Sequence, residues 1–165
     1  MASIFSRIIA GEIPCYKIAE TDRYFAFLDI SPLAKGHTLV VPKVEVDYIY
    51  DLDDETLAGL HLFAKKVAKA IETVVPCKRI GVAVIGLEVS HAHIHLIPLN
   101  KESDILFTNP RVKLSPEEMK ELENIVMTPH AGTACLSSRT ILASEAADNI
   151  ISYLVHQIEK NVINK

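Results

Sequence analysis

The sequence predicts an α+β fold, in which an antiparallel sheet packs against one long helix. Short strand-like runs follow one another through tight turns, and one strongly periodic segment interrupts them. Because strands and helices do not alternate regularly, a parallel sheet with crossover helices is not favoured. The 165 residues suffice for one domain of ordinary size, which we assign to residues 1–113, followed by a helical C-terminal extension over residues 114–165.

Three strand-like segments make up the first part of the predicted sheet. Residues 18–29 form a hairpin that turns at Thr21-Asp22 and returns through the sequence YFAFL. After a loop that contains Gly36, residues 37–41 form a buried strand of sequence HTLVV. Pro42 cannot donate a ladder hydrogen bond, so we expect this strand to stop there.

The long helix is predicted over residues 51–74. Its apolar side chains recur at steps of three and four along one face: Leu57, Leu60, Ala64, Val67, Ile71 and Val74. Asp53, Asp54 and Glu55 fall in the first turn, where the helix dipole favours negative charge, and Pro76 follows the end. The segment therefore presents one apolar stripe that a sheet can cover.

Three histidines alternate with apolar residues in the last predicted strand. After a strand over residues 80–85 and a turn at Gly86, the sequence HAHIHLIP begins at His91. In an extended strand, positions two apart face the same way, with backbones about 6–7 Å apart. His91, His93 and His95 are therefore expected to line one face, while the intervening apolar side chains enter the core.

The C-terminal extension begins with a helix start signal. Ser115 is placed to cap a helix, Pro116 to occupy its first position and Glu118 to complete a capping box. A second long amphipathic helix is predicted over residues 140–160. We expect this helix to pack on the first domain or on a partner chain.

Composition and charge exclude several classes of protein. The formal net charge is −4 and no cluster of Lys or Arg stands out, so we expect neither a nucleic acid polymer nor a membrane as partner. The three cysteines, Cys15, Cys77 and Cys135, have no metal-type spacing and are predicted to be reduced thiols of a cytoplasmic protein. The N-terminal segment meets charge before any long apolar run, unlike a signal peptide or an anchor.

Three functions compete for the alternating histidines, and the first two are a structural cluster and a metal site. A structural cluster needs a hydrogen-bond partner for every buried ring nitrogen, which is demanding for three imidazoles in register. A zinc site needs ligands that converge at about 2.0–2.1 Å, whereas the outer histidines of a strand start about 13 Å apart. A third ligand must then come from elsewhere, such as His37 or Glu45.

Covalent catalysis at phosphorus is the third function. A neutral imidazole, held in one tautomer by a hydrogen bond to its other nitrogen, can attack a phosphate ester or anhydride directly. Flanking imidazoles can supply hydrogen bonds to the phosphoryl oxygens. A central His93 between His91 and His95 has the layout that this chemistry needs.

The histidine segment and three earlier blocks resemble the histidine-triad (HIT) family. The family signature, alternating histidines followed by two hydrophobic residues, is matched by HAHIHLI at residues 91–97. The family's opening segment is similar to IFSRIIAGEIP at residues 4–14, and its next two blocks are similar to AFLDISP at residues 26–32 and GHTLVVPK at residues 36–43. The four blocks keep the family's order, cover roughly residues 3–100 and imply a HIT-like antiparallel sheet.

The resemblance implies a nucleotide hydrolase or nucleotidyl transferase that uses no metal and no cofactor. His93 would attack the α-phosphate of a phosphoramidate, a nucleotidyl anhydride or a dinucleotide polyphosphate, and water would cleave the resulting nucleotidyl-histidine. His91 and His95 would orient His93 and hold phosphate oxygens, with His37 as an outer support. HIT hydrolases commonly dimerise, so a homodimer is expected.

The same resemblance implies the nucleotide-binding residues. Phe5, Phe27 and Ile30 would line an apolar pocket for the base, and Asp29 would accept hydrogen bonds from the ribose hydroxyls. Aromatic and aliphatic walls accept a base without reading it closely, and a carboxylate suits a vicinal diol. Taken without the family, the three apolar residues would be ordinary core.

Several positions depart from the family's pattern. Ser3 and Ser6 stand where many members carry a Cys-x-x-Cys pair that joins a zinc site, and Glu45 stands where a second histidine is common. Glu88, a further candidate catalytic residue, takes the place of a hydroxyl that helps the leaving group, and residues 81–85 lack the usual asparagine. A carboxylate there repels phosphate if ionised, or donates a proton if its pKa is raised. Two alternatives therefore stay open: a nucleotide-binding module without catalysis, and a zinc-dependent hydrolase.

The sequence TPHAG at residues 128–132, with the segments after it, resembles the C-terminal end of D-2-hydroxyacid dehydrogenases. His130 would match the acid/base histidine of that family. That chemistry needs a nicotinamide cofactor, but the chain has no Gly-x-Gly-x-x-Gly after a strand. We therefore predict that His130 takes no part in catalysis.

Overall fold

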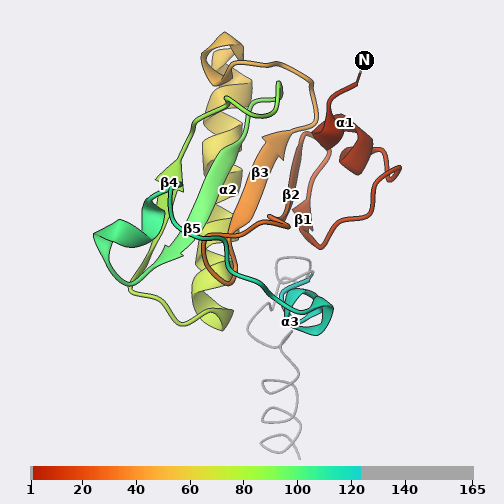
Figure 1. Cartoon of the computed structure of the whole chain (residues 1–165). Coiled ribbons are helices and arrows are strands. Elements are labelled where there is room, and N and C mark those ends of the chain that lie inside the picture. Colours follow the sequence, from red (N-terminus) through yellow and green to blue (C-terminus); the bar gives the residue numbers. More distant parts are fainter. Residues whose placement is uncertain (1, 124–165) are drawn as a thin grey trace, which may run out of the picture.

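The computed structural model describes residues 2–123, and at their centre lies a five-stranded sheet in the order β1-β2-β3-β5-β4 (Figure 1). All of its strand pairs are antiparallel, and α2 lies against one face. The elements are, in chain order, α1 (Ile4–Ile9), β1 (Lys17–Glu20), β2 (Tyr24–Leu28), β3 (Thr38–Pro42), the 3₁₀ helix η1 (Ile49–Asp51), α2 (Asp54–Val74), β4 (Arg79–Ala83), β5 (Ile94–Leu99), the 3₁₀ helix η2 (Glu102–Ile105) and α3 (Pro116–Lys120). The predicted α+β class is confirmed.

The predicted hairpin and the strand after it are present as β1, β2 and β3. The Thr21 hydroxyl oxygen accepts a hydrogen bond of 3.0 Å from the Tyr24 backbone N–H, which closes the turn. β2 pairs with β3 along its whole length, from Tyr24 opposite Pro42 to Leu28 opposite Thr38. β3 ends at Pro42, as expected from a residue without an N–H.

The long helix begins later than predicted, at Asp54 instead of residue 51. The Asp53 side chain accepts a hydrogen bond of 2.8 Å from the Thr56 backbone N–H and so caps the helix. The residues before this cap form η1 instead. Most of the predicted apolar stripe is buried against the sheet: Leu60, Ala64, Val67 and Ile71.

The histidine segment is only partly a strand, which corrects the prediction of a continuous strand from His91. β5 begins at Ile94 and pairs with β3 and β4. The two histidines before it lie outside the ladder because the Ala92 backbone N–H donates instead to the Val46 carbonyl oxygen, at 2.7 Å, in the loop after β3. The alternation nevertheless survives, since Ala92, Ile94 and Leu96 are all buried in the core beside α2.

The face of the sheet away from α2 carries a second, smaller apolar cluster. Its buried members are Phe5, Phe25, Phe27, Leu39 and Val41. Phe5 comes from α1, a helix of six residues that is too short to show a periodic signal in the sequence. The cluster packs beside the histidines, because the ring of Phe5 lies edge-on to the rings of His91 and His93.

The start of α3 confirms the predicted helix signal. Ser115 caps the helix, Pro116 opens it and Glu118 completes the capping box. Met119 and Leu122 are buried in the core that includes α2. The boundary between residues 113 and 114 stays a prediction, and the helix expected over 140–160, Cys135 and the dehydrogenase-like segment with His130 lie outside the described residues.

Within residues 2–123, no helix combines the length and the apolar character needed to cross a bilayer. Cys15 and Cys77 are free thiols. Burial raises the pKa of both, so both stay protonated at neutral pH and neither is an activated nucleophile.

Candidate active site

Four histidines lie together on the sheet face opposite α2. His37, His91, His93 and His95 are all more than nine-tenths buried, and the ring centroids of His93 and His95 are 4.9 Å apart. Among the described residues no buried side-chain nitrogen or oxygen lacks a hydrogen-bond partner, so the bonds that each ring makes fix its tautomer. A ring nitrogen that makes no hydrogen bond to the described residues must therefore be in contact with solvent.

His93 is held with its proton on Nδ1. That nitrogen lies 2.6 Å from the carbonyl oxygen of His91, which can only accept, so Nδ1–H is the donor. In a neutral ring the lone pair is then on Nε2. This atom takes no hydrogen bond from residues 2–123 and therefore faces solvent, free to attack a substrate.

On one side of His93, His95 and His37 form a relay of hydrogen bonds, which we call the His95 side. The Leu33 backbone N–H donates to His37 Nδ1 at 3.1 Å, so the proton of His37 is on Nε2. His37 Nε2–H in turn donates to His95 Nδ1 at 3.0 Å. His95 is thereby left with an Nε2–H that points away from the relay and can donate to a bound anion.

On the other side of His93, which we call the His91 side, His91 is held by one backbone and one side-chain group. Its Nε2–H donates to the carbonyl oxygen of Pro42, at 2.8 Å. Its Nδ1 must then accept, and the hydroxyl of Ser3 donates to it at 2.8 Å. Both nitrogens of His91 are thus engaged, so His91 has no free N–H to donate to a phosphate oxygen. His95, in contrast, keeps its Nε2–H free for this purpose.

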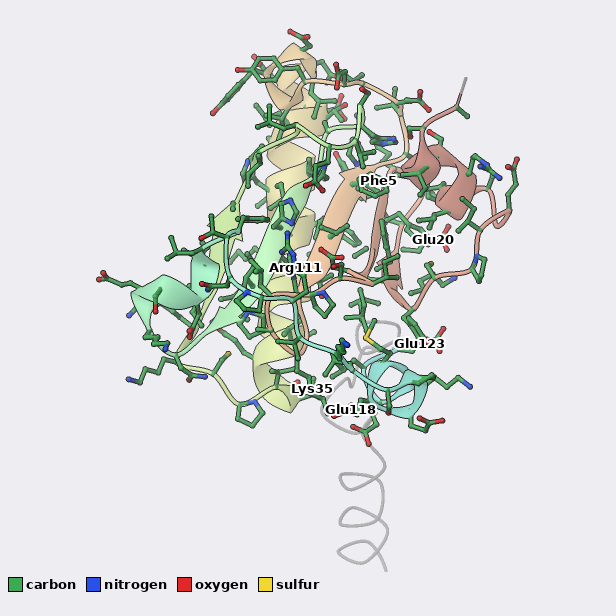
Figure 2. All side chains as sticks on the ribbon, in the orientation of Figure 1. Phe5, Glu20, Lys35, Arg111, Glu118 and Glu123 are labelled. Atoms are coloured by element: carbon green, nitrogen blue, oxygen red, sulfur yellow. The ribbon has the colours of Figure 1, made fainter. Side chains whose placement is uncertain are left out.

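The flanking rings are neutral at physiological pH. Burial is the main cause that lowers the pKa of His37 to about 4 and that of His95 to about 3, and it also lowers the pKa of His91. The positive charge of Arg111, which is labelled over the middle of the sheet in Figure 2, lowers the pKa of His37 and His95 further. Asp29 opposes the shift at His37 without reversing it.

Phe5 and Phe27 form an apolar wall next to the histidines. Their ring centroids are 5.4 Å apart in an edge-to-face arrangement, and the ring of Phe5 lies 5.2 Å from that of His93. Figure 2 shows Phe5, on α1, beside the end of β3. The structure therefore brings these two predicted nucleotide-binding residues to the imidazole row.

Asp29 follows β2 directly and lies beside the His95 side. Its Oδ2 is 3.6 Å from His37 Nδ1, and its Oδ1 accepts a hydrogen bond of 2.8 Å from the Ser31 backbone N–H. The neighbouring Ile30 points elsewhere, because its side chain is 82% exposed. It borders a separate hollow of about 260 Å³ whose other lining residues are Tyr16, Pro32, Leu114, Pro116 and Met119.

Glu88 is exposed in the loop between β4 and β5. Its side chain makes no hydrogen bond or ion pair with the part of the chain that the structure describes. Of the predicted site residues, Ile30 and Glu88 are therefore the two that the structure does not join to the histidine cluster by a described contact. The remaining predicted residues are all connected to it.

Two groups of residues could be considered as metal ligands. Asp29, His37 and His95 offer ligand atoms within 4.8 Å of one another, but a metal bound at these nitrogens would break the relay on the His95 side. The second group occupies the positions where the resemblance implies zinc ligands in other members: Ser3, Ser6 and Glu45, next to His91. Zinc takes thiolate, imidazole or carboxylate ligands, and the two serines offer only hydroxyls that are already hydrogen-bonded. These residues do not fit a zinc ion.

Sequence reasoning missed several groups that orient the histidines. Three of them are backbone groups, the N–H of Leu33 and the carbonyls of Pro42 and His91, which no residue type marks. A fourth is Phe107, whose ring lies edge-on to His95 at 4.9 Å between centroids. A lone aromatic residue in the otherwise polar stretch after β5 is the one sequence signal that points to it.

The fold and the row of buried imidazoles define an enzyme of the histidine-triad type. The chain belongs to the HIT family, whose HIT domain matches residues 10–102. It is 42% identical over 125 residues to the adenosine 5'-monophosphoramidase hnt1 of Schizosaccharomyces pombe, an alignment that covers 74% of this chain and 93% of that protein.

Solved structures give the same result. A Hit-like protein from Bartonella henselae, described as involved in cell-cycle regulation, is 33% identical with a TM-score of 0.63, over 73% of this chain and 90% of its own. A zinc-bound histidine triad family protein from Mycobacterium smegmatis is 25% identical with a TM-score of 0.66, over 87% of this chain and 98% of its own. The predicted HIT-like sheet is therefore confirmed.

Proposed function

We propose that this protein hydrolyses nucleotides at the α-phosphate through a covalent nucleotidyl intermediate on His93. The observation that carries the proposal is the tautomer of His93, whose Nδ1–H is tied to a carbonyl and whose Nε2 lone pair faces solvent. The phosphoramidase relative favours an adenosine 5'-phosphoramidate as substrate. Nucleotidyl anhydrides and dinucleotide polyphosphates present the same reacting phosphorus.

The reaction proceeds in two displacements. In the first, the lone pair of His93 Nε2 forms a bond to the α-phosphorus, and the bond from phosphorus to the leaving group breaks. A leaving amine keeps the electron pair of that bond and takes up a proton. The positive charge that develops on the ring is stabilised by the His91 carbonyl at Nδ1–H.

In the second displacement, water attacks the same phosphorus and releases one proton to solvent, while the phosphorus–nitrogen bond breaks and its electron pair returns to Nε2. The nucleoside monophosphate leaves, and His93 returns to its neutral tautomer. His95 Nε2–H donates to a non-bridging phosphoryl oxygen in both steps, because its other nitrogen is occupied by His37.

The nucleotide itself is held by the residues around this row. Phe5 and Phe27 contact the base, and the Asp29 carboxylate accepts hydrogen bonds from the ribose hydroxyls. Ile30 reaches the base only if its exposed side chain turns toward Phe5 when the nucleotide binds. Glu88 would supply the proton that the leaving group takes up only in its protonated form and with the loop before His91 bringing its carboxyl group to the phosphate.

The proposal includes a homodimer, which an exposed edge of the sheet supports. β4 is an edge strand of the sheet, and a second copy can pair with it. The strand and the loop after it expose four apolar side chains that such a partner would cover: Val82, Val84, Ile85 and Leu87. Sedimentation equilibrium is expected to give twice the chain mass of 18.2 kDa, and a monomer at all concentrations would contradict this part of the proposal.

The proposed function is tested by turnover of adenosine 5'-phosphoramidate in the presence of a metal chelator. His93→Ala is expected to lower kcat by about 10³-fold or more while changing the Kd for AMP less than threefold, because it removes the nucleophile and little contact area. His61→Ala, which removes an exposed histidine from α2, is the matched control and should retain full activity. An active His93→Ala variant contradicts the mechanism, loss of wild-type activity in chelator favours the zinc enzyme, and binding without turnover favours the binding module.

A further inference from the structure

A hydrogen-bonded network of three side chains lies beside His91: Ser3, Ser6 and Glu45, which we call the serine–glutamate clasp. The Ser3 hydroxyl lies 2.8 Å from His91 Nδ1, and its oxygen accepts the Ser6 backbone N–H at 3.0 Å, which caps α1. The Glu45 carboxylate accepts the Ser3 backbone N–H at 2.9 Å and the Ser6 hydroxyl. The clasp therefore joins the N-terminus, the loop after β3 and the histidine segment.

The direction of these hydrogen bonds is determined by Glu45. The bonds from Ser6 and Ser3 lower the pKa of Glu45, so it is a carboxylate at neutral pH and can only accept. Ser6 must then give its hydroxyl proton to Glu45. The Ser3 hydroxyl has two acceptors within reach, His91 Nδ1 at 2.8 Å and Ser6 Oγ at 3.1 Å. It donates to His91 Nδ1, because the His91 tautomer fixed by Pro42 on the opposite side of the ring needs a donor at that nitrogen.

The backbone at His91 and His93 needs such an anchor because it lies outside the sheet. β5 begins only at Ile94, so the ladder does not fix the residues before it. The His91 ring, which is fully buried, is held between Ser3 and Pro42, and the His91 carbonyl receives the Nδ1–H of His93 at 2.6 Å. A shift of His91 therefore moves the acceptor that fixes the tautomer of His93.

We propose that Ser3, Ser6 and Glu45 are positioning residues for the reaction of His93. They act through His91. The clasp fixes the position of the His91 ring and thereby of the His91 backbone, whose carbonyl oxygen accepts the Nδ1–H of His93. The catalytic part of this inference rests on the proposed function, whereas the hydrogen bond from Ser3 to His91 can be tested without activity. If the clasp only anchored α1, which carries Phe5, its loss would weaken nucleotide binding and leave kcat unchanged.

Two serine caps allow a matched test in the whole 165-residue chain. Ser3→Ala and Ser115→Ala each remove the N-cap of a short helix, but only Ser3 contacts a histidine. Ser3→Ala is expected to lower kcat for adenosine 5'-phosphoramidate about tenfold or more with the Kd for AMP within twofold, because the nucleophile is misplaced. Ser3→Thr, which keeps a hydroxyl, should recover kcat to within about threefold, and Ser115→Ala should leave kcat within about twofold.

Glu45→Ala provides a second variant that carries little risk of misfolding, since the Glu45 side chain is exposed. It removes the acceptor of the Ser3 backbone N–H and of the Ser6 hydroxyl, so the contact from Ser3 to His91 is held less firmly. We expect kcat to fall about threefold to tenfold. Normal kcat in both Ser3→Ala and Glu45→Ala, or equal losses of kcat and AMP affinity, would overturn the proposal.

The ¹⁵N chemical shifts of the His91 ring give a readout that is independent of turnover. The wild type should show a single neutral tautomer with the proton on Nε2, and Ser3→Ala should shift the Nδ1 resonance of His91. An unchanged His91 spectrum in Ser3→Ala would overturn the clasp. If the wild type shows no turnover, the proposed function fails, but these shifts still decide whether Ser3 positions His91.

Discussion

The two sides of His93 are held by different kinds of contact. On the His95 side, the relay runs through buried rings and ends on the Leu33 backbone N–H. On the His91 side, the ring is held by a serine hydroxyl that belongs to a network ending on the exposed Glu45. The two histidines that flank His93 thus have different supports: a second buried imidazole and main chain for His95, and a main-chain carbonyl with a serine hydroxyl for His91. We expect the first side to govern stability and the second to govern positioning.

Acidification is expected to have the largest effect, because it destabilises the His95 side. The pKa of His37 is about 4 and that of His95 about 3 in the folded protein, against an ordinary 6.5 in the unfolded chain. Below pH 6.5 the unfolded state therefore binds more protons than the folded state, so stability falls as the pH falls toward 4. At pH 5 each of these two histidines lowers the free energy of unfolding by about 2 kcal/mol relative to neutral pH.

Urea unfolding at pH 7.5 and pH 5 measures this effect. The free energy of unfolding should drop by about 4 kcal/mol from these two residues together. His37→Phe should show a smaller drop than the wild type because one of the two titrating rings is gone. Equal stability at the two pH values would mean that the relay is protonated in the folded state.

His37→Ala is the next largest change, and it removes the middle of the relay. It leaves the Leu33 N–H and His95 Nδ1 without their partners and opens a cavity in a buried site. We expect the free energy of unfolding to fall by about 3 kcal/mol, measured by urea titration at pH 7.5. His61→Ala, at an exposed position, should change it by less than about 0.5 kcal/mol. A loss at His37 no larger than at His61 would refute the buried relay.

Glu88→Ser is expected to have the smallest effect, and it tests the loop that leads into the His91 side. Glu88 lies in the loop that leads into His91, so replacing it should alter protonation of the leaving group while the histidines stay in place. The ratio of kcat/KM for a phosphoramidate over a nucleotidyl anhydride should change about threefold to tenfold. Glu102→Ser, another exposed glutamate, serves as the control. An unchanged ratio would make Glu88 an ordinary surface residue.

Local signals in the sequence predicted much of the fold. The apolar stripe predicted α2, and the serine, proline and glutamate at residues 115–118 predicted the start of α3. The strand at the histidines was predicted too long, because its start at Ile94 depends on a hydrogen bond from Ala92 to the distant Val46. Pairing between remote segments leaves no periodic pattern.

The residues of the candidate site were likewise predicted where a local pattern or the family resemblance marks them, and missed where remote segments meet. Alternation placed the three histidines on one face, and the family resemblance pointed to His37. Ser3 was interpreted only as a departure from a zinc site, and Glu45 as such a departure or as a metal ligand, because a contact between Ser3 and His91, 88 positions apart, cannot be read from spacing. Ile30 was expected in the base pocket but borders another hollow, since the chain turns after Asp29.

The central claim, covalent catalysis by His93, is tested most directly by intact-protein mass spectrometry. Wild type and His93→Ala are mixed with adenosine 5'-phosphoramidate in chelator and quenched rapidly at neutral or alkaline pH, because a phosphorus–nitrogen bond is labile in acid. We expect a nucleotidyl adduct on the wild type and none on His93→Ala. Turnover by the wild type without any adduct at the earliest times, or an adduct of equal yield on His93→Ala, would contradict it.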